Sequence, residues 1–155
     1  MPTNLDKTRP QSTAASITTE SITLHGRILL AEDGPDNRRL LTSHLRDRGA
    51  EVVIAENGQI AVDLAANNSF DLILMDIQMP VMDGYTAATM LRSLGCATAI
   101  VALTANASAE DRKKCVASGC TEYLRKPVDC HILLKAVSQY LGKAAFAASP
   151  ASKLS

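Results

Sequence analysis

Short aliphatic runs alternate five times with longer segments of helical periodicity, and this alternation constrains the fold more than any other feature. Strands that are nearly continuous in Ile, Leu and Val are buried on both faces, as in a parallel sheet covered by helices. The pattern predicts an α/β domain with a doubly wound five-stranded parallel sheet and five helices. The runs are RILLA (27–31), EVVIA (51–55), DLILM (71–75), AIVAL (99–103) and TEYLR (121–125).

Turn and capping residues mark the ends of several predicted helices. Pro35 suits the first turn of the first helix, which Gly49 would end. Ser108 and Asp111 have the spacing of a capping box at the start of the fourth helix, and Asp129 is the predicted N-cap of the fifth. These residues support the alternation of strands and helices independently of the aliphatic runs.

The segments on either side of this pattern differ from it in composition. Residues 1–24 are rich in Ser and Thr with few large apolar side chains, which is typical of a flexible linker or a disordered segment. Residues 143–155 are rich in small residues and predict a disordered tail. The chain of 155 residues has room for one ordinary domain with a core, and we expect that domain to occupy residues 25–142.

The charge balance argues against several classes of function. Sixteen basic and sixteen acidic residues give a formal net charge of zero, so no global field attracts the chain to nucleic acid or to an anionic membrane. The sequence has neither an apolar run near the ~20 residues of a membrane span nor the apolar core of a signal peptide. We therefore expect a cytoplasmic domain with no nucleic-acid or membrane contact in this chain.

Polar residues follow four of the five predicted strands. In an open parallel sheet, the carboxyl ends of all strands lie along one rim, where ligands bind. Taken singly, each residue is better explained as a turn, cap or surface residue. Their joint occurrence at the same end of four strands favours a functional site. The residues are Glu32 and Asp33 after the first strand, Asp76 after the third, Thr104 after the fourth and Lys126 after the fifth.

The charges of this set predict its chemistry. Three carboxylates face one ammonium group, and like charges oppose full ionisation unless a cation neutralises them. Hard oxygen ligands suit Mg²⁺, with Mn²⁺ as an alternative. A carboxylate beside a metal ion and a lysine can attack phosphorus, and Asp76 is the predicted nucleophile because it ends the central strand. Asp83 and Gly84, which follow, are interpreted only as a turn and a cap.

Four motifs together resemble the receiver domain of response regulators in two-component signalling. The resemblance covers about residues 27–141 and implies the flavodoxin-like receiver fold, with strand order 2-1-3-4-5. By this resemblance, Glu32 and Asp33 bind Mg²⁺, Asp76 is phosphorylated, and the backbone carbonyl of Gln78 completes the metal ligands. The motifs are LLAED (29–33), LMDIQMPVMDG (74–84), ALTA (102–105) and YLRKP (123–127).

The resemblance also implies roles for residues on the last two strands. Thr104 and Lys126 would contact the phosphoryl oxygens, and Tyr123 would change rotamer as Thr104 moves. This movement would report phosphorylation to the face formed by the fourth helix, fifth strand and fifth helix. The resemblance makes Pro127 a candidate for a cis peptide bond, which the residues alone would not predict because most X-Pro bonds are trans.

The sequence leaves open which kind of receiver this is. Two motifs and the linker-like segment before the domain resemble the receiver of a hybrid sensor histidine kinase. The motifs are MDIQMPVMDG (75–84) and ALTANA (102–107). The alternative is a stand-alone response regulator. The phosphoryl donor would be a histidine kinase or a phosphotransfer domain, the downstream partner is unknown, and a homodimer is possible. The cytoplasmic domain could then be the soluble part of a membrane-associated kinase.

Two rival functions belong to other classes. A docking module that is never phosphorylated would not need the intact set of rim residues. A metal-dependent phosphatase with an aspartyl nucleophile usually carries a second aspartate two residues later, where this chain has Gln78. Whether the parent protein is an enzyme stays open.

Overall fold

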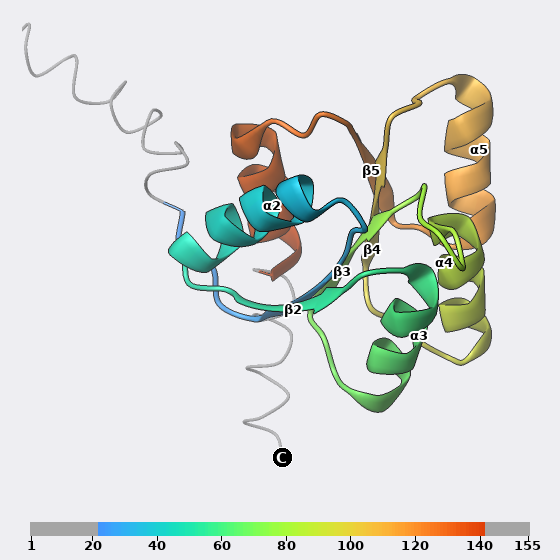
Figure 1. Cartoon of the computed structure of the whole chain (residues 1–155), viewed down its shortest axis with the longest axis horizontal. Helices are drawn as coiled ribbons and strands as arrows, with labels where there is room; N and C mark the ends of the chain where they lie inside the picture. The colour runs from blue at the N-terminus through green and yellow to red at the C-terminus, as the bar shows by residue number, and fades with distance from the viewer. Residues whose placement is uncertain (1–21, 142–155) are drawn as a thin grey trace, which may run out of the picture.

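Five parallel strands form the centre of the molecule, and helices cover both faces of the sheet (Figure 1). The computed structural model describes residues 22–141. The strands pair in the order β2-β1-β3-β4-β5, which confirms the predicted fold class and strand order. Their bounds are β1 (Arg27–Ala31), β2 (Glu51–Ala55), β3 (Leu72–Asp76), β4 (Ile100–Thr104) and β5 (Glu122–Arg125).

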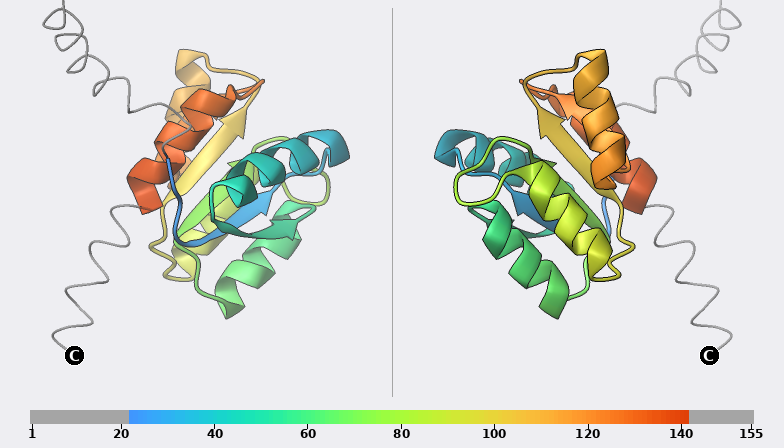
Figure 2. Two further views of the ribbon diagram at one scale, coloured as in Figure 1. Left: turned by 90° about the vertical axis from the view of Figure 1, so that its left-hand side faces the viewer. Right: turned by 90° about the vertical axis from the view of Figure 1, so that its right-hand side faces the viewer.

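The helices fall into two layers. One layer holds α2 and the last helix, residues 130–141, and the other holds α3, α4 and α5 (Figures 1 and 2). Across residues 22–141, no helix combines the length and hydropathy that crossing a bilayer requires. The bounds of the labelled helices are α2 (Pro35–Asp47), α3 (Gly58–Asn67), α4 (Gly84–Ser93) and α5 (Ala109–Ser118).

Each face of the sheet packs against its own hydrophobic cluster. Successive strand residues point to opposite faces, so Leu74 packs in the cluster under α2 while Ile73 and Met75 pack in the cluster under α3 and α4. All residues of β3 and β4 are buried. This burial on both faces confirms the interpretation of the aliphatic runs as strands of a covered parallel sheet.

The predicted starts of three helices are confirmed. Helix α2 begins at Pro35, and the Ser108 hydroxyl accepts a hydrogen bond from the Asp111 backbone N–H at 3.1 Å. The Asp129 carboxylate accepts from the backbone N–H of His131 at 2.8 Å. These caps satisfy N–H groups that have no partner within the helix.

The strands β3 and β4 begin and end one residue later than predicted. Asp76 and Thr104 are the last residues of these strands, where they pair with Leu103 and Arg125 in the neighbouring strands. The prediction followed the aliphatic run, whereas backbone pairing continues through a polar residue. The two functional candidates are therefore held by the sheet itself.

The predicted linker boundary at residue 24 is wrong for its last residues. Leu24 is only 1% exposed within the core, and its backbone N–H donates to the Arg48 carbonyl at 2.7 Å. Ile22 packs against the same cluster. These two apolar side chains cover the end of the core. The predicted linker over residues 1–21 and the predicted tail over residues 143–155 lie outside the described residues.

Candidate functional site

The rim at the carboxyl ends of the strands brings three carboxylates together. Glu32, Asp33 and Asp76 each offer one carboxylate oxygen, and these atoms lie within 4.8 Å of one another. The first and third side chains are buried, whereas Asp33 is exposed. Three hard oxygen donors at this spacing, with one side open to water, fit a small divalent cation such as Mg²⁺. We call this set the acidic cluster.

Lys126 is the cation beside the acidic cluster. Its Nζ atom lies 3.1 Å from Asp76 Oδ2 and 3.4 Å from Glu32 Oε1. One ammonium group cannot neutralise three carboxylates, so the site keeps an excess of negative charge. Buried charges that are only partly compensated are costly, and a bound cation would relieve that cost.

Burial and charge set the ionisation of Asp76 and Lys126. Burial is the main cause that raises the pKa of Asp76 from its ordinary value of 3.8 to about 6, and the charge of Glu32 adds to it, while Lys126 opposes both. Burial alone would lower the pKa of Lys126, but its hydrogen bond to Asp76 and the nearby carboxylates outweigh burial and raise it. Above about pH 6, Asp76 is therefore mainly ionised. A carboxyl group must be ionised to act as a nucleophile.

The start of α2 positions Glu32. The Glu32 carboxylate accepts hydrogen bonds from the Gly34 backbone N–H at 3.1 Å and from Asn37 Nδ2 at 2.9 Å. The Arg38 guanidinium donates to the Glu32 carbonyl at 3.1 Å. The sequence analysis did not identify Asn37 and Arg38 as site residues. The one feature in the sequence that could have indicated their role is their position about one helical turn after Glu32 and Asp33. These contacts orient the carboxylate toward Asp76.

The loop after β3 fixes the backbone around Asp76. The Gln78 backbone N–H donates to Asp76 Oδ1 at 3.2 Å. Asp83 caps α4, as predicted, but Gly84 does more than end a turn. A side chain at position 84 would collide with the Asp76 carbonyl oxygen, and the Gly84 N–H donates to the Ile77 carbonyl at 2.8 Å. Only glycine lets α4 approach the end of β3 this closely.

Thr104 lies at the same rim, but its hydroxyl is bonded to its own loop. The side chain is 4% exposed, and Oγ1 donates to the Asn106 carbonyl at 2.7 Å and accepts from the Asn106 N–H at 3.0 Å. A polar cleft of about 630 Å³ opens here, and Asp33, Gln78 and Thr104 line it. The cleft leaves the rim accessible from outside.

The structure places the remaining predicted residues near this rim. The Lys126–Pro127 peptide bond is cis, as the resemblance predicted. Tyr123 is half-buried on β5, opposite Ala102 of β4, and packs against the cluster under α3 and α4. All predicted rim residues therefore gather at one end of the sheet. Tyr123 lies further from the rim, opposite the residue two positions before Thr104.

Comparison with known proteins agrees with this geometry. A family model for the response regulator receiver domain matches residues 28–138. The chain is 38% identical over 113 residues to the sensor histidine kinase RcsC of Salmonella typhimurium. That match covers 73% of this chain and 12% of the relative, so the chain spans a small part of the relative's length.

Two solved structures carry the same fold. The receiver domain of sensor histidine kinase PA1611 from Pseudomonas aeruginosa PAO1, with a magnesium ion coordinated in its active-site cleft, matches with a TM-score of 0.70 and 38% identity. The match covers 76% of this chain and 98% of that one. The Saccharomyces cerevisiae co-crystal of the histidine phosphotransfer protein Ypd1 with the Ssk1 receiver domain matches with a TM-score of 0.74, 34% identity, and coverage of 77% and 91%.

The fold, the acidic cluster and the comparisons lead to one assignment. The rim residues were predicted from their places at the strand ends and the strand order from four motifs, and the family model spans those motifs. The chain belongs to the response regulator receiver domain family, whose members accept a phosphoryl group in two-component phosphorelays.

Proposed function

We propose that Asp76 is the residue that accepts the phosphoryl group, from a phosphohistidine donor and with Mg²⁺ held in the acidic cluster. The observation that carries this proposal is the meeting of three carboxylate oxygens within 4.8 Å, with Lys126 Nζ 3.1 Å from Asp76. Asp76 is buried at the end of the sheet, and its neighbours Asp33, Gln78 and Thr104 line the cleft beside it. No other described carboxylate has this combination of a strand end, a lysine partner and two acidic neighbours.

The side chains divide the chemistry between them. Glu32, Asp33, Asp76 and the Gln78 carbonyl would hold Mg²⁺, which when bound draws negative charge from the phosphoryl oxygens. An Asp76 carboxylate oxygen forms the new O–P bond while the N–P bond of the phosphohistidine breaks, and the imidazole keeps the electron pair. Lys126 then balances charge that the phosphoryl group adds.

The signal would leave the site through Thr104. Phosphorylation adds negative charge and strong acceptor oxygens at Asp76. To reach them, the Thr104 hydroxyl must leave its hydrogen bonds with Asn106. The space that Thr104 vacates lets Tyr123 turn inward, which changes the face formed by α5, β5 and residues 130–141. A difference of a few kcal/mol between the two conformations suffices to shift the population.

Relatives support a place for this domain within a phosphorelay. Similarity to the sensor histidine kinase RcsC and to a hybrid signal transduction histidine kinase favours a hybrid sensor histidine kinase as the parent protein, with this domain in the cytoplasm. The Ypd1–Ssk1 structure joins a receiver to a phosphotransfer protein, so a phosphotransfer domain or a histidine kinase is the proposed donor. A downstream protein or a second copy of this chain would bind the face formed by α5, β5 and residues 130–141, which changes when Tyr123 turns inward.

Phosphorylation by a small donor tests the proposal. The full chain is incubated with acetyl phosphate and Mg²⁺, and intact mass is measured before and after hydroxylamine. We expect one phosphoryl group that hydroxylamine removes, and none in Asp76→Asn. Asp63→Asn, at an exposed carboxylate on α3, is the matched control and should be phosphorylated like the wild type. An adduct that persists in Asp76→Asn, or none in the wild type, overturns the proposal.

A further inference from the structure

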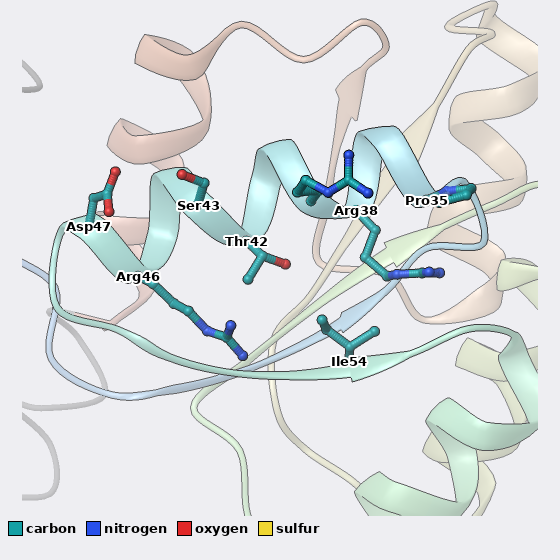
Figure 3. A pocket seen from close by; sticks show the side chains of 8 residues that line it. Pro35, Arg38, Thr42, Ser43, Arg46, Asp47 and Ile54 are labelled. Atoms are coloured by element: carbon teal, nitrogen blue, oxygen red, sulfur yellow. The ribbon is translucent and has the colours of Figure 1, made fainter.

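A groove between α2 and the outer strand β2 lies outside the rim and has the opposite charge (Figure 3). Its volume is about 430 Å³, within the range of roughly 300–1,000 Å³ that small-molecule pockets occupy. We call it the arginine groove. Its lining includes Arg38, Arg39, Arg46, Asp47, Thr42 and Ile54.

The arginine groove carries an excess of positive charge. Three guanidinium groups and one carboxylate in the lining leave two net positive charges. Arg46 donates one hydrogen bond to the Val52 carbonyl at 3.0 Å, and Arg39 lies 3.7 Å from Asp36 with 78% of its side chain exposed. A guanidinium group has five N–H donors, so both can still bind an anion. Arg38 is the least free, since it pairs with Glu56 and bonds the Glu32 carbonyl.

Thr42 adds an observation that does not depend on charge. Its side chain is 6% exposed, and within residues 22–141 its hydroxyl is the buried side-chain N or O atom without a hydrogen-bond partner. A threonine within a helix can bond a carbonyl one turn earlier, and a buried hydroxyl that lacks such a bond destabilises the fold. Figure 3 shows Thr42 between Arg38 and Arg46, pointing toward Ile54. The hydroxyl has no partner within the described residues, and it lies buried beneath the groove surface between the two arginines.

We propose that the arginine groove binds a small phosphorylated anion of nucleoside-diphosphate size. Arg39 and Arg46 hold the phosphates, because the planar guanidinium fork matches phosphate oxygens in pairs. The Thr42 hydroxyl bonds the same group, and the apolar body of the ligand lies on Ile54. Arg46 already covers the Val52 carbonyl at the sheet edge, which favours a compact anion over an extended peptide. The site does not depend on the acidic cluster, whose negative charge repels the same ligand.

Amide chemical shifts test the site directly. The ¹⁵N-labelled full chain, in buffer with EDTA, is titrated with inorganic pyrophosphate and separately with adenosine diphosphate. We expect saturable shifts concentrated in residues 35–47 and 51–55. Binding of pyrophosphate alone supports a phosphate site, and tighter binding of the nucleotide adds the contact with Ile54. The absence of saturable shifts with both probes, or shifts concentrated at the acidic cluster, overturns the proposal.

Matched variants separate a built site from general attraction to positive charge. Arg39→Gln removes an exposed guanidinium without touching the core, and together with Arg46→Gln it should weaken binding by at least about tenfold. Thr42→Val keeps the shape of the side chain and should weaken binding about fivefold while the fold stays intact by circular dichroism. Arg112→Gln, on the exposed face of α5, is the control and should leave the affinity unchanged. Equal affinities in all variants overturn the proposal.

Discussion

The acidic cluster lies at the start of α2 and the arginine groove lies along its length, and their buried polar groups are satisfied to different degrees. At the acidic cluster, the Glu32 carboxylate has partners from Gly34, Asn37 and Lys126, yet the site keeps excess negative charge. In the arginine groove, the charges are exposed or paired, but the buried Thr42 hydroxyl has no partner. One region has too few cations, and the other has a donor without an acceptor.

This difference indicates what each region should respond to. The stability of the acidic cluster should depend on pH and on divalent cations, because its cost is electrostatic. The stability of the arginine groove should be almost independent of both, because its cost comes from an uncharged hydroxyl. Arg38 is common to the two regions, since it lines the groove and donates to the Glu32 carbonyl. Substitutions that act on one region alone can test the contrast.

The largest effect should follow from removing the cation of the acidic cluster. Lys126→Met keeps the length of the side chain but leaves Glu32 and Asp76 without a positive neighbour. Removing one partner of a buried ion pair costs about 3–5 kcal/mol, and the partial exposure of Lys126 reduces this to about 2–3 kcal/mol at pH 8. Urea unfolding in EDTA measures the change. The loss should be smaller at pH 5, where Asp76 takes up a proton.

An exposed lysine controls for the general effect of losing a positive charge. Lys135→Met, on the last helix, should change the free energy of unfolding by no more than about 0.5 kcal/mol. Equal losses for Lys126→Met at pH 5 and pH 8 would show that packing, and not the charge of the acidic cluster, explains the effect.

Mg²⁺ should produce the next largest effect, in the opposite direction. A ligand that binds only the folded state at ten times its dissociation constant stabilises by about 1.4 kcal/mol. We expect a gain of this size between EDTA and saturating Mg²⁺. Asp33→Asn removes an exposed carboxylate that we propose as a ligand, and it should abolish most of the gain without destabilising the metal-free protein. An unchanged gain in this variant would place the ion elsewhere.

The sequence was sufficient to predict the acidic cluster but not the arginine groove, and the reason is physical. Asp76 stands out because the carboxyl ends of parallel strands meet at one rim, where it joins polar residues that end three other strands. Thr42 is one polar residue in a helix of mixed character, where nothing in the spacing shows whether its hydroxyl finds a partner. That property depends on side-chain packing between α2 and β2.

The same distinction explains the smaller errors. Strand ends were misplaced by one residue because side-chain polarity was used in place of backbone pairing, which continues to Asp76 and Thr104. Leu24 was assigned to the linker because its neighbours are polar, although a single leucine can cover the end of a core. Gly84 was predicted only as a cap, since its close approach to the Asp76 carbonyl is a tertiary contact. Local patterns predicted elements, and long-range contacts decided their details.

Asp76→Asn should show an effect similar in size to that of Mg²⁺, and this effect should depend on pH. Burial raises the pKa of Asp76 to about 6 in the folded state, above its ordinary value of 3.8. The folded protein then binds more protons than the unfolded chain between about pH 4 and pH 6, so wild-type stability falls as pH rises through this window. In EDTA at pH 8, Asp76→Asn should therefore be more stable by about 1–2 kcal/mol, a gain that disappears near pH 3. A loss at pH 8 would mean that pairing with Lys126 outweighs burial.

The smallest effect should come from the arginine groove, where Thr42→Val removes a hydroxyl that bonds nothing. Replacing an unpaired buried polar group by an apolar group of the same shape is neutral or stabilising, so we expect a gain of up to about 0.5 kcal/mol at both pH 5 and pH 8. Ser118→Ala is the matched change, because the buried Ser118 hydroxyl donates to the Lys114 carbonyl at 2.6 Å. That variant should lose about 0.5–1 kcal/mol in the same urea titration. A larger loss for Thr42→Val than for Ser118→Ala would show that the Thr42 hydroxyl has a partner in solution, and the contrast between the two regions would then rest on charge alone.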